Sequence, residues 1–283
     1  MGVGMARLFV FGMGYTARVL AAWVTARGWQ IVGTTRDGRE GTVRFGDADR
    51  VAAELAAATH VLSSVPPEGD ADPVLAAYGG AIGARAGWTG YLSSTGVYGD
   101  TRGAWVDESA PIGSGRRSAR AVADRAWLAT GARVFRLPGI YGPGRSPLER
   151  VREGRAHRVG LPYQVFSRVH VDDIVSGVVA AFDGPAGAYN LADDCPCDQD
   201  AVVSFAAELL GLPPPPVVAL DSLSPMARGF YAENRRVANG KAKRVLGWRP
   251  CYPDYRFGLR ALNATMRPQP VSTPPATDSV DQR

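Results

Sequence analysis

The sequence predicts an α/β protein with a doubly wound parallel sheet and a smaller α/β domain towards its C-terminus. Through the first half, short continuous apolar runs alternate with longer amphipathic stretches. Such runs are typical of parallel strands that helices cover on both faces of a sheet. A second observation is the glycine-rich turn between the first apolar run and the first amphipathic stretch. With 283 residues, the chain can bury a sizeable core.

The elements of the first half follow from this alternation in order. The apolar runs are expected to be strands and the amphipathic stretches to be helices. Strands are expected at residues 7–12, 30–35, 42–45, 59–65, 90–94 and 132–137. Helices are expected at residues 15–27, 50–58, 73–86 and 118–130.

The second half is less regular, because glycine and proline punctuate it from Pro138 to Pro147. A helix is expected at 171–182, a short strand at 188–191 and a helix at 198–210, followed by a stiff connector at 213–216. We predict a nucleotide-binding domain over 1–138, to which 168–195 return, and a mainly separate C-terminal substrate domain over 139–267. Residues 268–283 are rich in Pro, Ser, Thr and Asp without periodicity, which predicts a disordered tail.

Composition and charge exclude several classes of protein. The net charge is +5, and the basic residues are spread along the chain rather than gathered in one block. Nucleic-acid binding is therefore not required, and a small phosphorylated cofactor would benefit equally from this charge. The apolar run at 8–11 is too short for a signal peptide or a membrane span. We expect a cytoplasmic protein without membrane or nucleic-acid partners.

The three cysteines do not form a recognisable framework. Cys195 and Cys197 flank a proline, and Cys251 lies apart from them. A Cys-Pro-Cys segment resembles half of a metal site, but no Cys or His cluster completes it, so thiols in a turn are the preferred interpretation. We expect no bound metal, no disulfides and a reducing compartment.

The glycine turn has the spacing of a dinucleotide-binding motif. Gly12, Gly14 and Ala17 form a GxGxxA pattern directly after the first predicted strand. The first glycine permits the tight turn, the second lets a pyrophosphate approach the backbone, and the alanine lets the helix pack on the sheet. The free N–H groups of the helix N-terminus favour phosphate. This context predicts a Rossmann-type fold that binds a nicotinamide dinucleotide, rather than a glycine turn without a ligand.

The residues at the end of the second strand favour NADP. An NAD site would place Asp or Glu there to bind the ribose hydroxyls, whereas this chain has Thr34, Thr35 and Arg36. Arginine can hold a 2′-phosphate by bidentate, charge-assisted bonds. The alternative is that Arg36 belongs to a solvated loop.

Later motifs resemble the extended short-chain dehydrogenases/reductases, the relatives of nucleotide-sugar epimerases and dehydratases. Five segments occur in the order of that family and cover most of residues 7–262; they are residues 92–99, 136–145, 169–174, 189–191 and 241–250. The resemblance implies a Rossmann domain and a small C-terminal domain that encloses a substrate above the nicotinamide. It also implies cofactor contacts from the glycine turn and from the ends of the strands, at Gly12, Gly14, Tyr15, Thr16, Ala17, Thr35, Arg36, Ser64, Ser93 and Pro138.

The resemblance implies that Ser94 takes the position of the catalytic Ser/Thr and hydrogen-bonds the reacting oxygen. The family's catalytic Tyr and Lys are missing, because no Tyr or Lys occurs between Gly99 and Thr130. Alignment on Asp124 puts Arg116 and Arg120 on those two positions. Arginine stays protonated and cannot replace a tyrosine that transfers a proton near neutral pH. The chain therefore resembles the atypical branch of the superfamily.

A second departure concerns the dehydratases, whose Thr-Asp-Glu acid pair is replaced here by Ser94, Thr95 and Gly96. Sugar 4,6-dehydration is therefore not expected. Tyr98 and Tyr141 follow strands on the nicotinamide side, so either is a candidate proton donor, with a packing role as the alternative.

Arg116 and Arg120 are candidates for binding an anionic substrate. Arg145, Arg150 and Arg152 are further candidates, with a solvated basic loop as the alternative for these three. Two function classes remain. The first is an atypical NADPH-dependent oxidoreductase or epimerase that acts on a small hydroxy or carbonyl compound, anionic if the basic loop binds it. The second is a non-catalytic NADP-binding sensor or scaffold. The intact Ser94 and the basic loop favour the enzyme; family likeness suggests a monomer or homodimer.

Overall fold

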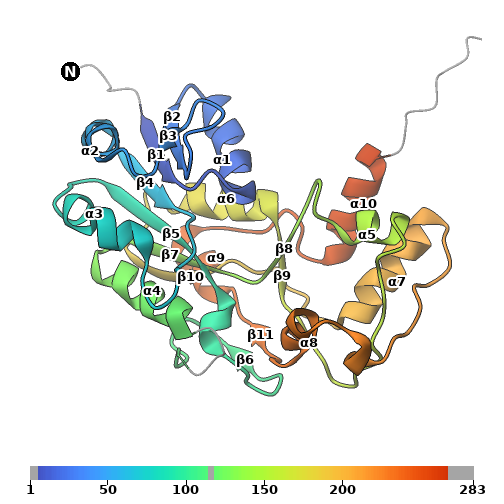
Figure 1. Cartoon of the computed structure of the whole chain (residues 1–283). Helices are drawn as coiled ribbons and strands as arrows, with labels where there is room; N and C mark the ends of the chain where they lie inside the picture. The colour runs from blue at the N-terminus through green and yellow to red at the C-terminus, as the bar shows by residue number, and fades with distance from the viewer. Residues whose placement is uncertain (1–5, 114–117, 267–283) are drawn as a thin grey trace, which may run out of the picture.

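The structure, a computed structural model, describes residues 6–113 and 118–266, and its centre is a parallel sheet of seven strands (Figure 1). The strand order is β10-β7-β5-β4-β1-β2-β3, so the chain starts in the middle and winds outwards in both directions. This confirms the predicted doubly wound α/β fold. The strands are β1 Arg7–Phe11, β2 Gln30–Thr35, β3 Val43–Arg44, β4 His60–Ser63, β5 Trp88–Ser94, β7 Arg133–Leu137 and β10 Gly187–Asn190.

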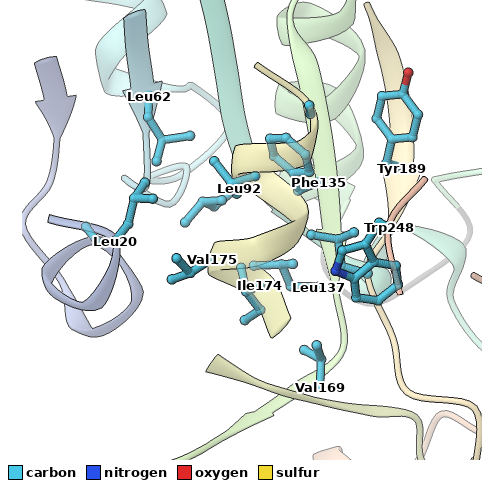
Figure 2. Close-up of a cluster of buried hydrophobic side chains, with 14 of the residues drawn as sticks. Leu20, Leu62, Leu92, Phe135, Leu137, Val169, Ile174, Val175, Tyr189 and Trp248 are labelled. Carbon is cyan, nitrogen blue, oxygen red and sulfur yellow. The ribbon is translucent and has the colours of Figure 1, made fainter. Parts of the chain in front are cut away.

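Helices cover both faces of this sheet, as the continuous apolar strands require. One face packs against α1 (Tyr15–Thr25) and α6 (Val171–Ala180), and Figure 2 shows side chains from both helices meeting the strands. The other face packs against α2 (Ala48–Ala57), α3 (Pro73–Gly83) and α4 (Ser118–Ala129). Each helix therefore buries its apolar stripe in one of two cores.

A third core lies beyond the sheet and is built by α5 (Pro147–Arg152), α7 (Gln199–Leu210) and α10 (Tyr255–Met266). These helices gather on the right of Figure 1, away from α2, α3 and α4. A short parallel pair, β8 (Gly139–Tyr141) and β9 (Arg168–His170), leads from the sheet into this region.

The C-terminal half returns to the sheet twice. Strand β10 extends the sheet beside β7, and α9 (Gly240–Leu246) packs with Trp248 against the core that Figure 2 shows. Between these returns lie the short helix α8 (Pro225–Tyr231) and the strand β11 (Arg236–Val237), which pairs with β6 (Trp105–Val106). The predicted tail at 268–283 lies outside the described residues.

Candidate functional site

The glycine turn after β1 is fixed by hydrogen bonds from the two neighbouring strands. The backbone N–H of Gly12 donates to Thr34 Oγ1 at 3.1 Å, and the Ser64 hydroxyl donates to the Gly12 carbonyl. Gly12 has φ +83°, and a Cβ there would lie 2.9 Å from Val65 Cγ2. Only glycine is accommodated at this position without strain. Ser64, predicted to contact the cofactor, thus supports the turn from β4.

The N-terminus of α1 is open where a pyrophosphate would approach. Gly14 is the N-cap and offers no side chain, whereas Asp47 and Asp72 cap α2 and α3. A Cβ at Gly14 would meet nothing closer than Ser64 Oγ at 4.0 Å. The first-turn N–H groups therefore lack a side-chain acceptor and present the positive end of the helix dipole to free space. These residues fit the pyrophosphate of a dinucleotide.

The next three residues of the motif have different surroundings. Ala17 is fully buried and packs α1 against the sheet, and Thr16 is also buried. Tyr15 is half-buried, and its hydroxyl donates to the Pro143 carbonyl at 2.9 Å. The Arg145 guanidinium lies 5.8 Å from the centre of the Tyr15 ring. Through Tyr15, the first turn of α1 thus contacts the loop that follows β8, which contains Pro143 and Arg145.

The end of β2 and the loop after it carry Thr35 and Arg36, on which the predicted preference for NADP rests. Arg36 is 93% exposed, and its only ion pair among the described residues is with the exposed Glu68 at 3.7 Å. Thr35 is turned into the loop, where its hydroxyl contacts Thr42 and accepts from the Gly38 N–H.

Two charged residues of this loop were missed by the sequence reasoning. Asp37 lies two residues beyond the strand, where its carboxylate accepts from the Thr35 hydroxyl at 3.1 Å. Its second oxygen lies 3.8 Å from Arg39, a further exposed cation. The sequence shows that Arg36, Asp37 and Arg39 lie close together in the chain. It does not show which of these side chains contacts the protein and which is free to contact a ligand.

The two serines at the end of β5 differ in exposure: Ser94 is partly exposed and Ser93 is buried. Ser94 is partly exposed, and its hydroxyl oxygen accepts the Gly96 N–H at 3.1 Å, which leaves the hydroxyl proton free to be donated. Ser93 is buried, and its hydroxyl donates to Asp124 at 2.7 Å. Ser94 can therefore bind an oxygen of a ligand, whereas the Ser93 side chain is engaged with α4.

Tyr98 belongs to a buried network. Its hydroxyl donates to Asn190 Oδ1 at 2.8 Å and accepts from Arg136 Nη1 at 3.0 Å. Arg136, which is 3% exposed, also makes a bidentate pair with the fully buried Asp124, at 2.7 and 3.1 Å. Burial raises the pKa of Tyr98 to about 12, although Arg136 acts in the opposite direction. This surrounding favours a structural role for Tyr98 over proton transfer near neutral pH.

Tyr141 is also buried, and its hydroxyl faces α10, where it lies 2.2 Å from the position of a Cβ at Gly258. Burial raises the pKa of Tyr141, and the nearby carboxylates of Asp193 and Asp173 raise it further. A tyrosine in this surrounding is a poor proton donor. Pro138 connects β7 to β8 and precedes this tyrosine by three residues.

Arg116 and Arg120 align with the positions of the missing Tyr and Lys. Arg116 lies outside the described residues. Arg120 is on α4, where its guanidinium lies near the Tyr91 hydroxyl of β5. Burial raises the pKa of Tyr91, and Arg120 partly opposes that effect. Arg120 is therefore close to β5, and its role in binding a substrate stays a prediction.

A cavity of about 650 Å³ opens between the third core and the β8–β9 pair. Its wall begins at Gly139, two residues after Leu137, which pairs in register with Ser94. Arg145 and Arg150, both candidates from the sequence for binding an anionic substrate, are among its lining residues, whereas Arg152 is not. Phe230, which sequence reasoning missed, also lines it. A smaller cavity of about 230 Å³ shares Arg150 and Phe230. The volume of the larger cavity is typical of a small-molecule site.

Within residues 6–113 and 118–266, no group of three or more His, Cys, Asp or Glu side chains is placed to hold a metal ion. Cys195, Cys197 and Cys251 are free thiols. No helix in the described part of the chain combines the length and apolar character needed to span a membrane.

Comparisons with known proteins agree with this geometry. No family model matches the chain. The chain is 45% identical to a conserved protein of unknown function from Silicibacter pomeroyi, whose structure has been solved. The match covers 92% of this chain and 99% of that protein, with a TM-score of 0.86. Protein YeeZ of Escherichia coli K12 is 28% identical over 88% of this chain and 97% of its own length.

Two further matches come from proteins with named ligands or activities. A 3-diazoavenalumate denitrifying reductase from Streptomyces is 33% identical, but over only 44% of this chain and 45% of its own. The human epimerase family protein SDR39U1, solved with NADPH, has a TM-score of 0.73 at 17% identity, with 92% of this chain and 100% of its own covered. The predicted resemblance to extended short-chain dehydrogenases/reductases is thereby confirmed at the level of the fold.

Proposed function

Because the chain belongs to the same family as the conserved Silicibacter pomeroyi protein and has the fold of the extended short-chain dehydrogenases/reductases, we propose that it binds NADP. The observation that carries this proposal is the N-terminus of α1 behind Gly14, which has no side-chain cap. The helices α2, α3 and α7 instead begin with the capping side chains of Asp47, Asp72 and Asp198. The exposed Arg36 favours the 2′-phosphate over an unmodified ribose.

We further propose that the bound cofactor serves catalysis, as an atypical NADPH-dependent oxidoreductase or epimerase. When bound, the nicotinamide supplies or accepts a hydride. Ser94 would donate a hydrogen bond from its hydroxyl to the reacting oxygen of a small hydroxy or carbonyl compound and so hold that oxygen in place. The cavity supports this proposal, since it provides room for such a compound and its wall begins at Gly139, two residues beyond the register partner of Ser94.

A non-catalytic NADP-binding sensor is the second candidate. The burial of Tyr98 and Tyr141 favours it, because neither hydroxyl is exposed to take the place of the missing catalytic tyrosine. The two candidates differ in single-turnover oxidation of NADPH by carbonyl compounds, which only the enzyme would show.

The cofactor assignment is tested by titration with NADPH and with NADH. We expect NADPH to bind at least about tenfold more tightly, which corresponds to about 1.4 kcal/mol. The substitution Arg36→Asp should erase or invert this preference, whereas Arg152→Asp on the exposed surface of α5 should leave it unchanged. Equal affinity of the unaltered protein for both dinucleotides would refute the assignment to NADP.

A further inference from the structure

The larger cavity contains an exposed aromatic surface. The rings of Phe166 and Phe230 both line it, and they stack with their centres 4.5 Å apart and their planes 13° from parallel. Phe230 is 50% exposed despite this stacking. Because Phe230 also lines the smaller cavity, its uncovered ring lies where the two spaces adjoin. A half-exposed ring in a cavity wall provides a surface on which a flat apolar group can stack.

One cation beside this ring is available to a ligand. Arg150 lines both cavities together with Phe230, and among the described residues it has no ion pair and no side-chain hydrogen bond. Of the other arginines of the larger cavity, Arg155 pairs with Glu153. Arg145 lies over the ring of Tyr15 and lines the larger cavity but not the smaller one.

The fourth arginine, Arg168, is only 6% exposed and donates to the carbonyl oxygens of Phe166, Cys197 and Asp198 and to the side chain of Gln199. Its donors are therefore committed to the protein. In the part of the chain that the structure describes, Arg150 is the unpaired cation that lines both cavities together with Phe230, so its guanidinium is placed to bind an anion beside that ring.

Two carboxylates, Glu149 and Glu153, also belong to the wall of the larger cavity. Both are engaged within the protein, Glu153 with Arg155 and Glu149 with two backbone N–H groups. The planar guanidinium of Arg150 can therefore make a bidentate pair with a carboxylate of the ligand.

We propose that the two adjoining cavities bind a planar aromatic carboxylate, with its ring on Phe230 and its carboxylate on Arg150. The inference rests on the proposed function in that it names the class of substrate for the same site. It is nevertheless tested by binding alone, so that its failure and the failure of NADP binding are separate results.

The experiment is isothermal titration of the full chain with trans-cinnamate, an aromatic monocarboxylate, and with UDP as the alternative planar anion, each with and without NADPH. We expect saturable binding of cinnamate that is tighter than that of UDP. Arg150→Gln and Phe230→Ala should each weaken it about tenfold or more, because each removes one of the two recognising groups. Arg152→Gln is the matched control, since Arg152 lies on the same helix and lines neither cavity.

Tighter binding of UDP than of cinnamate would overturn the proposal, and so would unchanged affinity in Arg150→Gln with an unaltered circular dichroism spectrum. If the protein binds NADPH but not cinnamate, this inference is wrong while the assignment of the cofactor stands. If it binds cinnamate but neither dinucleotide, the proposed function fails and the cavity assignment stands.

Discussion

The two glycines of the turn after β1 should respond to substitution in opposite ways. Gly12 has φ +83°, and a Cβ there would lie 2.9 Å from Val65 Cγ2, so Gly12→Ala strains the backbone and displaces a neighbour. Strain of this kind costs about 1–3 kcal/mol. With about 2 kcal/mol lost, the Tm should fall by roughly 4–8 °C. Gly14 lies in ordinary backbone geometry with φ −79°, and a side chain there has space.

The variant Gly14→Val should therefore fold with a free energy of unfolding within about 0.5 kcal/mol of the unaltered protein. Its valine side chain instead fills the space that the pyrophosphate would occupy. The assay is thermal unfolding with and without NADPH. At a hundred times its Kd, NADPH should stabilise the unaltered protein by about 2.7 kcal/mol. That stabilisation should be absent in Gly14→Val. Full stabilisation of Gly14→Val by NADPH would refute the assignment of the turn to the cofactor.

Two further predictions concern the reaction and the pH dependence of stability. Ser94→Ala should slow single-turnover oxidation of NADPH by an accepted substrate about a hundredfold, since the hydroxyl that binds the reacting oxygen is lost; turnover unaffected by the change would show that the reaction takes place elsewhere. Burial raises the pKa of Asp193 to about 8 in the folded protein, so this group should make the free energy of unfolding fall as pH rises from about 4 to 8. Denaturant titrations between pH 5 and 8 should show a flatter dependence in Asp193→Asn, and an identical slope in both proteins would contradict this reasoning.

The main sheet could be predicted from the sequence because its signals are local. Strand β2 begins and ends at the predicted residues, and the glycine turn is identified by spacing alone. The strands β6 and β11 could not be predicted, since each has two residues and carries no periodicity. Their pairing joins Trp105 to Arg236, which are far apart in the chain.

The environments of the candidate site residues depend on long-range contacts. Tyr98 follows a strand that ends at the site, which suggested a chemical role. Its hydroxyl is instead buried and donates a hydrogen bond to Asn190, which is 92 residues away in the chain. Arg150 and Phe230 likewise come from helices whose patterns give no sign that they meet at a cavity. The position of a residue along a strand could be inferred, whereas the direction and partners of its side chain could not.

The most direct test of NADP binding at this site is a crystal structure of the protein with NADPH. We expect the pyrophosphate against Gly14 and the N-terminus of α1, and the 2′-phosphate in contact with Arg36. A dinucleotide bound away from the end of β1, or a 2′-phosphate that Arg36 does not contact in an otherwise ordered site, would contradict the account.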